Sequence, residues 1–260
     1  MNRVIVAISG GLGSAWCAYW AVRKYGRNRI VLYFNDTKWE HPDLYRFLND
    51  ISSDLNIPIT EDSDGRTPEE IFYKERMLGN NLKPLCSKIL KADRLKAFYQ
   101  DGDILIFGIG RNELHRAHRL VSRYQALSAT TGKYPYLEFP LINAQHPLDL
   151  WSWTESNGIA VPELYQLGFS HNNCYGGCVR AGKKQWRLLR KVFPKVYLDR
   201  ERVEREISEF LNRRVTVFKD ESLTEFRQRI DGGRLSRFYQ TSQFPLFECS
   251  ECVGICDSLS

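Results

Sequence analysis

The sequence predicts an α/β fold: a doubly wound, mostly parallel sheet covered by helices on both faces, with a helical, cysteine-rich C-terminal portion. Strand-like segments alternate with segments of helical periodicity over the first two-thirds of the 260 residues. The longest apolar stretches, residues 4–8 and 104–109, have the length of buried strands. Such repeated alternation is typical of a parallel sheet with helical crossovers.

The individual elements follow from apolar spacing and from start and stop residues. The predicted strands cover residues 3–8, 29–34, 57–60, 103–109 and 138–142. The predicted helices cover residues 13–25, 41–56 and 86–99, and a further helix starts at residues 67–70. The sequence Thr-Pro-Glu-Glu favours that start because threonine caps a helix and proline suits its first turn.

The pattern changes after about residue 143. Short helical or turn segments rich in tryptophan and tyrosine are followed by a cysteine pair, a basic helix, a mixed-charge helix over 199–212 and a cysteine-rich tail. We therefore expect an α/β domain over residues 1–145 and a helical portion over residues 146–260 that packs on it.

Composition bounds the class of protein. The chain is 43% hydrophobic and 13% aromatic, which favours a sizeable core over disorder. No apolar run reaches the length of a membrane-spanning helix, and Ser9-Gly10-Gly11 interrupts the first apolar stretch too early for a signal peptide. We expect a cytoplasmic protein with no membrane partner, in which the seven cysteines stay reduced.

Positive charge is concentrated in residues 180–195, the basic stretch, which contains no acid. Its basic residues are Arg180, Lys183, Lys184, Arg187, Arg190, Lys191 and Lys195. Such a stretch suits a polyanion, either nucleic acid or a phosphorylated nucleotide. An ordinary solvated helix face is an equally good interpretation.

A small-residue turn, Ser9-Gly10-Gly11-Leu12-Gly13-Ser14, joins the first strand to the first helix. Its glycines allow close approach of the backbone to a polyphosphate, its hydroxyls can donate hydrogen bonds, and the helix N-terminus offers unpaired N–H groups. The spacing fits neither G-x-x-x-x-G-K-[ST] nor G-x-G-x-x-G, which weakens the kinase-type and dehydrogenase interpretations. A tight strand–helix turn without a ligand is the alternative.

This turn resembles the SGGxDS loop of the PP-loop ATP pyrophosphatases, within the adenine nucleotide α-hydrolase superfamily. The resemblance implies that Ser9, Gly10, Gly11, Gly13 and Ser14 bind the pyrophosphate of ATP. Gly13 stands where many members have aspartate, so a role of that acid is supplied elsewhere or absent.

The end of the second strand carries a further candidate, Asp36. Family members often have an acid near the nucleotide at this point, which implies a Mg²⁺ or ribose contact. The alternative is that Asp36 caps the following helix.

Residues 107–116 resemble the segment of sulfonucleotide reductase relatives that leaves the carboxyl edge of the sheet beside the nucleotide. Ligands of open α/β sheets bind at that edge. The resemblance makes Gly108, Glu113 and Arg116 nucleotide-binding candidates, with His115 and Arg119 as further ones. Arg116 suits phosphate because of its guanidinium fork; the candidate catalytic residues are Ser9, Asp36 and Arg116.

Five cysteines form two groups, Cys174 with Cys178, and Cys249 with Cys252 and Cys256. Such spacing can supply four thiolates to zinc or to an iron–sulfur cluster, whereas unrelated reduced thiols are the alternative. Cys17, within the first apolar helix, is expected to be a buried packing thiol.

The segment before Cys174 resembles adenylyl- and phosphoadenylyl-sulfate reductases, with Pro147-Leu148, Trp153, Ile159, Pro162-x-Leu164-Tyr165 and Gly168-Phe169. Residues 171–182 are similar to the PP-loop proteins of DNA phosphorothioation systems, DndC and SspD, and to related phage proteins. The resemblance implies a [4Fe–4S] cluster, favoured over zinc, on Cys86, Cys174, Cys178 and Cys249. Cys252 is the rival fourth ligand, and Cys256 a possible sulfur carrier. Cys86 starts a helix, so its pKa is expected to be lowered.

One departure bears on the reaction. Sulfonucleotide reductases carry a C-terminal E-C-G-x-H motif, whereas Glu248-Cys249 is followed here by Ser-Glu-Cys. The resemblance therefore favours an ATP pyrophosphatase that adenylates an acceptor for sulfur insertion, with ATP and Mg²⁺, and a cysteine desulfurase or other sulfur-donor protein as partner. DNA backbone phosphate is favoured over tRNA as acceptor. The alternatives are an adenylyl- or phosphoadenylyl-sulfate reductase, a tRNA thiolase, and a zinc-stabilised nucleic-acid-binding subunit.

Overall fold

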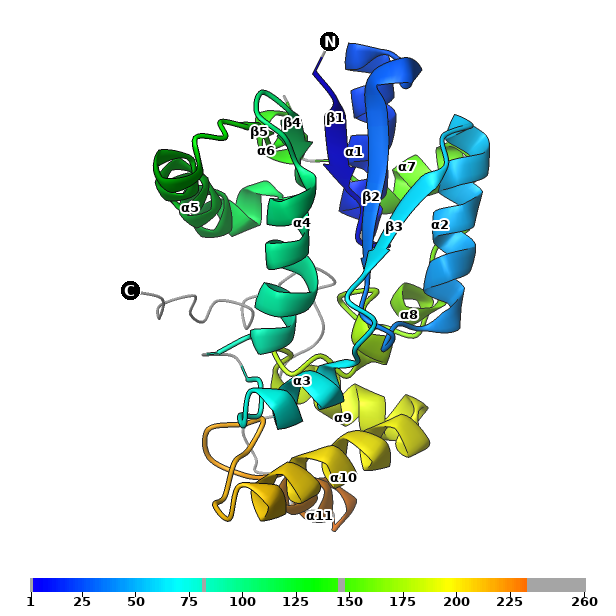
Figure 1. Ribbon diagram of the computed structural model, residues 1–260. Helices are drawn as coiled ribbons and strands as arrows, with labels where there is room; N and C mark the ends of the chain where they lie inside the picture. The colour runs from blue at the N-terminus through cyan, green and yellow to red at the C-terminus, as the bar shows by residue number, and fades with distance from the viewer. Residues whose placement is uncertain (1, 81–82, 145–147, 233–260) are drawn as a thin grey trace.

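The computed structural model describes residues 2–80, 83–144 and 148–232. Its centre is a five-stranded sheet with the order β3-β2-β1-β4-β5, in which every pairing is parallel (Figure 1). The strands are β1 Val4–Ala7, β2 Ile30–Asp36, β3 Ile59–Ser63, β4 Ile104–Ile106 and β5 Tyr136–Glu138. The predicted fold class is confirmed.

Helices connect the strands and continue beyond them. Those of the sheet-containing part are α1 Leu12–Tyr25, α2 Pro42–Leu55, α3 Pro68–Lys74, α4 Asp93–Phe98, α5 Leu114–Thr131 and α6 Pro140–Asn143. Those that follow are α7 Leu150–Ser156, α8 Glu163–Gln166, α9 Lys183–Val192, α10 Pro194–Phe210 and α11 Leu223–Asp231. None of the helices in the described ranges has both the length and the apolar character needed to cross a bilayer.

β1 lies at the centre of the sheet because the chain winds outward in both directions from it. Val4 is in register with Ile30 of β2 on one side and with Ile104 of β4 on the other. The loops after β1 and β4 therefore leave the same edge of the sheet as neighbours. This is the topological switch point at which open α/β sheets bind their ligands.

The two faces of the sheet build separate cores, because successive strand residues point to opposite faces. Val4 and Val6 pack with α1 and α2 on one face. Ile5 packs with Tyr99 and Tyr124 on the other, which α4 and α5 cover (Figure 1). Cys17 is fully buried in the first core, as predicted for a packing thiol.

Two predicted elements are corrected by the structure. The strand predicted over 138–142 is wrong: β5 ends at Glu138, and Pro140 starts the short helix α6. Proline has no N–H for a sheet ladder but suits the first turn of a helix. The strand predicted over 103–109 is only three residues long, and 107–110 form an irregular loop.

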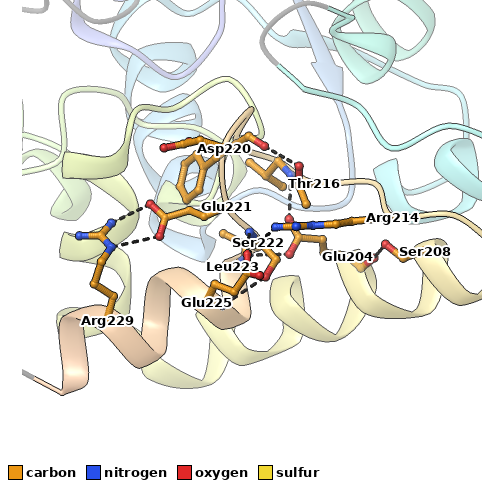
Figure 2. Close-up of polar contacts among 12 residues, drawn as sticks. Glu204, Ser208, Arg214, Thr216, Asp220, Glu221, Ser222, Leu223, Glu225 and Arg229 are labelled. Carbon is orange, nitrogen blue, oxygen red and sulfur yellow. Dashed lines mark hydrogen bonds and ion pairs between the residues drawn. The ribbon is translucent and has the colours of Figure 1, made fainter.

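The helices α9, α10 and α11 form a third core, which also takes Phe72 and Leu78 from the sheet-containing part. Figure 2 shows how the chain between α10 and α11 is held. The buried Glu204 carboxylate accepts the backbone N–H groups of Val217 at 2.7 Å and Leu223 at 2.6 Å. The helical portion thus packs on the first part; the division at residue 145 stays a prediction.

Candidate nucleotide and cysteine site

The loop between β1 and α1 is closed by its own serines. Ser14 Oγ accepts the N–H of Ser9 at 3.1 Å and donates to the carbonyl of Gly11 at 2.8 Å. Gly10 has a φ of +76°, which favours glycine. Gly11 is the N-cap of α1 and has no side chain to bond the first N–H groups of the helix. The loop has the backbone features that bind phosphate at a helix N-terminus.

The loop after β4 lies directly against this phosphate loop. A Cβ atom on Gly108 would be 2.7 Å from the backbone nitrogen of Ser14 and 2.9 Å from the carbonyl carbon of Gly13. A Cβ atom on Gly13 would meet a Leu141 methyl group at 3.0 Å. The switch point therefore brings together Gly108 and the predicted pyrophosphate residues.

A third segment, α8 and the chain that follows it, completes the wall around the phosphate loop. The buried Asn172 donates its amide to the carbonyl oxygen of Gly10 at 2.8 Å. The hydroxyl of Tyr165 lies beside Gly11, 3.1 Å from where a Cβ would be. Burial raises the pKa of Tyr165 to about 12, against hydrogen bonds from backbone N–H groups. Asn172 was not among the sequence-predicted site residues, although the resemblance over residues 171–182 includes it.

Asp36 is buried at the end of β2 and fully engaged. Its carboxylate accepts the backbone N–H of Lys38 at 2.8 Å, the Tyr45 hydroxyl at 2.8 Å and the Lys38 ammonium at 2.7 Å. Burial would raise the pKa of Asp36, but the hydrogen bonds from Lys38 outweigh it and the pKa is lowered. The capping alternative is wrong, because His41 is the N-cap of α2. The metal or ribose contact stays a prediction.

Glu113 and Arg116 form an ion pair with each other at the start of α5. Arg116 is exposed, with 42% of its side chain accessible. The structure thus places both residues just beyond the loop that contains Gly108, and within the described ranges Arg116 bonds Glu113 and makes no hydrogen bond with the phosphate loop. Their nucleotide contact stays a prediction.

Three of the predicted ligand cysteines converge from two segments of the chain. Cys174 and Cys178 flank a tight turn and share a hydrogen bond that lowers the pKa of Cys178. Cys86 precedes a π-helical turn, Ser87–Ala92, that leads into α4. Burial, and next the charge of Cys178, raise the pKa of Cys86 to about 11. The lowered pKa expected of Cys86 from its helix-start position is therefore wrong, because desolvation exceeds the dipole effect.

A buried carboxylate that the sequence did not single out holds the cysteine turn. Glu40 accepts the backbone N–H of Cys174 at 2.6 Å, the hydroxyl of Thr37 at 2.9 Å and the ammonium of Lys91 at 3.3 Å. Burial lowers the pKa of Lys91, but the Glu40 carboxylate outweighs it and raises that pKa. Lys91 also lies within electrostatic reach of all three thiols, including Cys86.

The donor chemistry of this cluster is that of soft thiolates, which suit zinc or an iron–sulfur cluster. Within the described ranges, however, no group of three or more histidine, cysteine, aspartate or glutamate side chains could hold a metal ion. Cys249, Cys252 and Cys256 lie outside the described residues. The three thiols of the described ranges therefore do not form a metal site by themselves.

Parts of the basic stretch are neutralised in the fold. Lys183 pairs with Asp220 at 2.5 Å, and Arg190 pairs with Asp231 at 2.9 Å. Lys191 and Lys195 are exposed. Some basic side chains of this stretch thus form ion pairs with acidic side chains of the helical C-terminal portion, and others are exposed.

Residues 3–178 match the phosphoadenosine phosphosulfate reductase domain, which is more than half of the chain. The matched region includes the phosphate loop and the whole sheet, and it ends at Cys178. A search of curated proteins found no match.

Proposed function

The chain belongs to the phosphoadenosine phosphosulfate reductase domain family, whose members are enzymes acting on adenine nucleotides, and we propose that it is an ATP pyrophosphatase. It adenylates an acceptor so that sulfur can be inserted. The observation that carries this proposal is the phosphate loop: a Ser-Gly-Gly turn at the switch point, held by Gly108 on one side and Asn172 on the other. The best candidate for the acceptor is a DNA backbone phosphate, as in DNA phosphorothioation.

In the proposed reaction the β,γ-phosphates of ATP lie on residues 9–14, with Mg²⁺ near Asp36. An acceptor oxygen attacks the α-phosphorus, the bond from that phosphorus to the β-phosphate oxygen breaks, and pyrophosphate leaves. A sulfur nucleophile from a donor protein, such as a cysteine desulfurase, then displaces AMP from the adenylated acceptor. The protein contributes positioning and charge neutralisation, from backbone N–H groups of the loop and from Arg116.

Cys86, Cys174 and Cys178 support the proposal of a [4Fe–4S] cluster, with Cys249 as fourth ligand, Cys252 as its rival and zinc as the less favoured metal. A bound cluster would supply sulfur handling or electron transfer beside the nucleotide. Glu40 and Lys91 orient the cysteine turn and balance thiolate charge, as their contacts to Cys174 indicate.

The family match itself favours a second candidate, reduction of a sulfonucleotide. That reaction needs a cysteine nucleophile for the sulfate sulfur. The E-C-G-x-H motif that carries it in reductases is absent from this sequence. Adenylation is therefore the preferred proposal.

Product analysis on anaerobically purified protein distinguishes the two. ATP and the two sulfonucleotides are offered separately, and pyrophosphate and sulfite are measured. We expect pyrophosphate from ATP, and its loss in Ser9→Ala because the loop loses a hydroxyl donor. Ser156→Ala is the matched control, since that exposed hydroxyl only bonds a carbonyl of its own helix. Sulfite release with ATP inert would replace the proposal with the reductase.

A further inference from the structure

Helix α5, Leu114–Thr131, is basic and contains no aspartate or glutamate. It carries three arginines and two histidines: Arg116, Arg119, Arg123, His115 and His118. Its buried residues are Ala117, Tyr124 and Ser128. Tyr124 packs on Tyr99, with ring centroids 5.6 Å apart. The helix thus packs on the sheet-containing part through one face, and its basic side chains lie on the other faces.

Three of the five basic residues lie on the face opposite the attachment. At 100° per residue, His115, Arg119 and Arg123 lie on one side of the helix, and Ala117 and Tyr124 lie on the other. The helix has 18 residues, so this face extends about 27 Å. The spacing of phosphates along one nucleic-acid strand is a few ångströms, so the face is long enough for several phosphates.

Two of the three arginines of α5 have an acidic partner, and both stay largely exposed. Arg116 pairs with Glu113, and Arg123 lies 3.7 Å from Asp93, with both side chains exposed by at least 40%. Arg119 forms no ion pair with any residue in the described ranges. The basic stretch is also paired in part, Lys183 with Asp220 and Glu221 and Arg190 with Asp231, so α5 is distinguished by its place beside the switch point.

The position of α5 connects it to the proposed reaction. The helix follows, after a single 3₁₀ turn, the loop whose Gly108 touches the backbone of Ser14. From there α5 extends past α4 on the side of β4 and β5, away from α9, α10 and α11 (Figure 1). A strand whose reacting phosphate lay at the switch point would have its neighbouring phosphates along this helix.

We propose that the outer face of α5, with His115, Arg119 and Arg123, binds the sugar–phosphate backbone of DNA on either side of the reacting phosphate. The identity of the reacting phosphate rests on the proposed function; the binding surface rests on the charge and placement of α5. Arg119 is its central contact, because no residue of the described chain competes for its guanidinium group.

The test is the fluorescence anisotropy of a labelled 20-nucleotide DNA, single-stranded or duplex, with the full-length protein and no ATP. Each phosphate contact contributes a salt dependence with an exponent of about 0.9 on duplex DNA and about 0.7 on single-stranded DNA, so losing one contact weakens binding about eightfold or about fivefold at 0.1 M salt. We expect Arg119→Ala to raise Kd by about this factor and to reduce the salt slope by about one. Arg119→Lys should keep most of the affinity, because a phosphate contact needs charge more than a fork.

Lys195→Ala is the matched control, since it removes one exposed charge from the basic stretch. It should change Kd by less than about twofold, because it lies outside the proposed path. The inference is overturned if Arg119→Ala binds DNA like the wild type, or if Lys195→Ala weakens binding as much. Binding of tRNA through Arg119 without binding of DNA would also overturn it.

Because this assay contains no ATP, it is separate from the test of the proposed function. If DNA binding depends on Arg119 but the protein releases no pyrophosphate, the result supports the proposed DNA-binding surface and contradicts the proposed adenylation activity. Pyrophosphate release by a protein that binds no DNA would overturn the surface alone.

Discussion

Gly108→Ala would add one methyl group at the contact between the two switch-point loops. The new Cβ would lie 2.7 Å from the nitrogen of Ser14 and 2.9 Å from the carbonyl carbon of Gly13 and the Cα of Ser14. Ordinary contacts of a Cβ begin near 3.4 Å, so the loops must separate by about 0.7 Å. All three atoms are backbone, so no side-chain rotation can relieve the contact.

The expected effects on catalysis and on stability are similar in free energy, because a 10- to 100-fold loss of rate corresponds to about 1.4–2.7 kcal/mol. Overpacking of this kind costs about 1–3 kcal/mol. A displacement near 1 Å at a positioning element lowers a rate about 100-fold. We therefore expect pyrophosphate release to fall by about 10- to 100-fold and ATP to bind more weakly, while the protein stays folded.

Gly110→Ala is the matched control in the same loop. Its φ of −88° suits alanine, and its Cβ would meet only the side-chain oxygen of Asn112, at 2.9 Å, which can rotate away. Calorimetric titration with ATP, pyrophosphate release and urea unfolding are measured on both variants. The reasoning is refuted if Gly108→Ala binds ATP and releases pyrophosphate like the wild type.

Two further predictions concern buried carboxylates. Glu40→Gln should lower the free energy of unfolding by about 2 kcal/mol and the melting temperature by about 4–8 °C, because the Lys91 ammonium loses its partner. In scanning calorimetry the control Glu61→Gln, 51% exposed, should shift little, and equal shifts would contradict the prediction. Burial raises the pKa of Glu204 to about 7, against two backbone N–H donors, so the folded state binds the extra proton between pH 4.5 and 7. Wild-type stability from this group therefore falls as pH rises through that window. The glutamine of Glu204→Gln does not titrate. In urea unfolding, the variant's free energy of unfolding should therefore lie further below that of the wild type at pH 5 than at pH 8. A difference that is larger at pH 8 would contradict the assignment.

The phosphate loop and most elements were predictable because their signals are local. The apolar run before Ser9 and the glycines after it specify a strand, a tight turn and a helix within a few residues. α5 was not predicted, because its attached face consists of Ala117, Tyr124 and Ser128 and gives little apolar periodicity. Local patterns describe elements best where the buried face is large and apolar.

The supporting residues of the site were not predictable in the same way. Asn172 bonds Gly10 across 162 residues, and Glu40 bonds Cys174 across 134. Such contacts depend on the topology of the sheet, which no local spacing encodes. The partners of Asp36 show the same limit, because the sequence around an aspartate at a strand end does not tell whether its carboxylate faces a lysine or a metal ion.

The bond from Asn172 to Gly10 also constrains the order of folding. Contacts of such high sequence separation form slowly, because the entropy of closing a long loop is lost before the contact is gained. During synthesis the phosphate loop emerges first, yet its wall is incomplete until the chain has passed Asn172. Under the proposed function, ATP bound within the finished wall would stabilise the whole chain by mass action. The proposed nucleotide binding would therefore report that residues far downstream have folded, because a nascent chain that ends before α8 carries the phosphate loop without Tyr165 and Asn172.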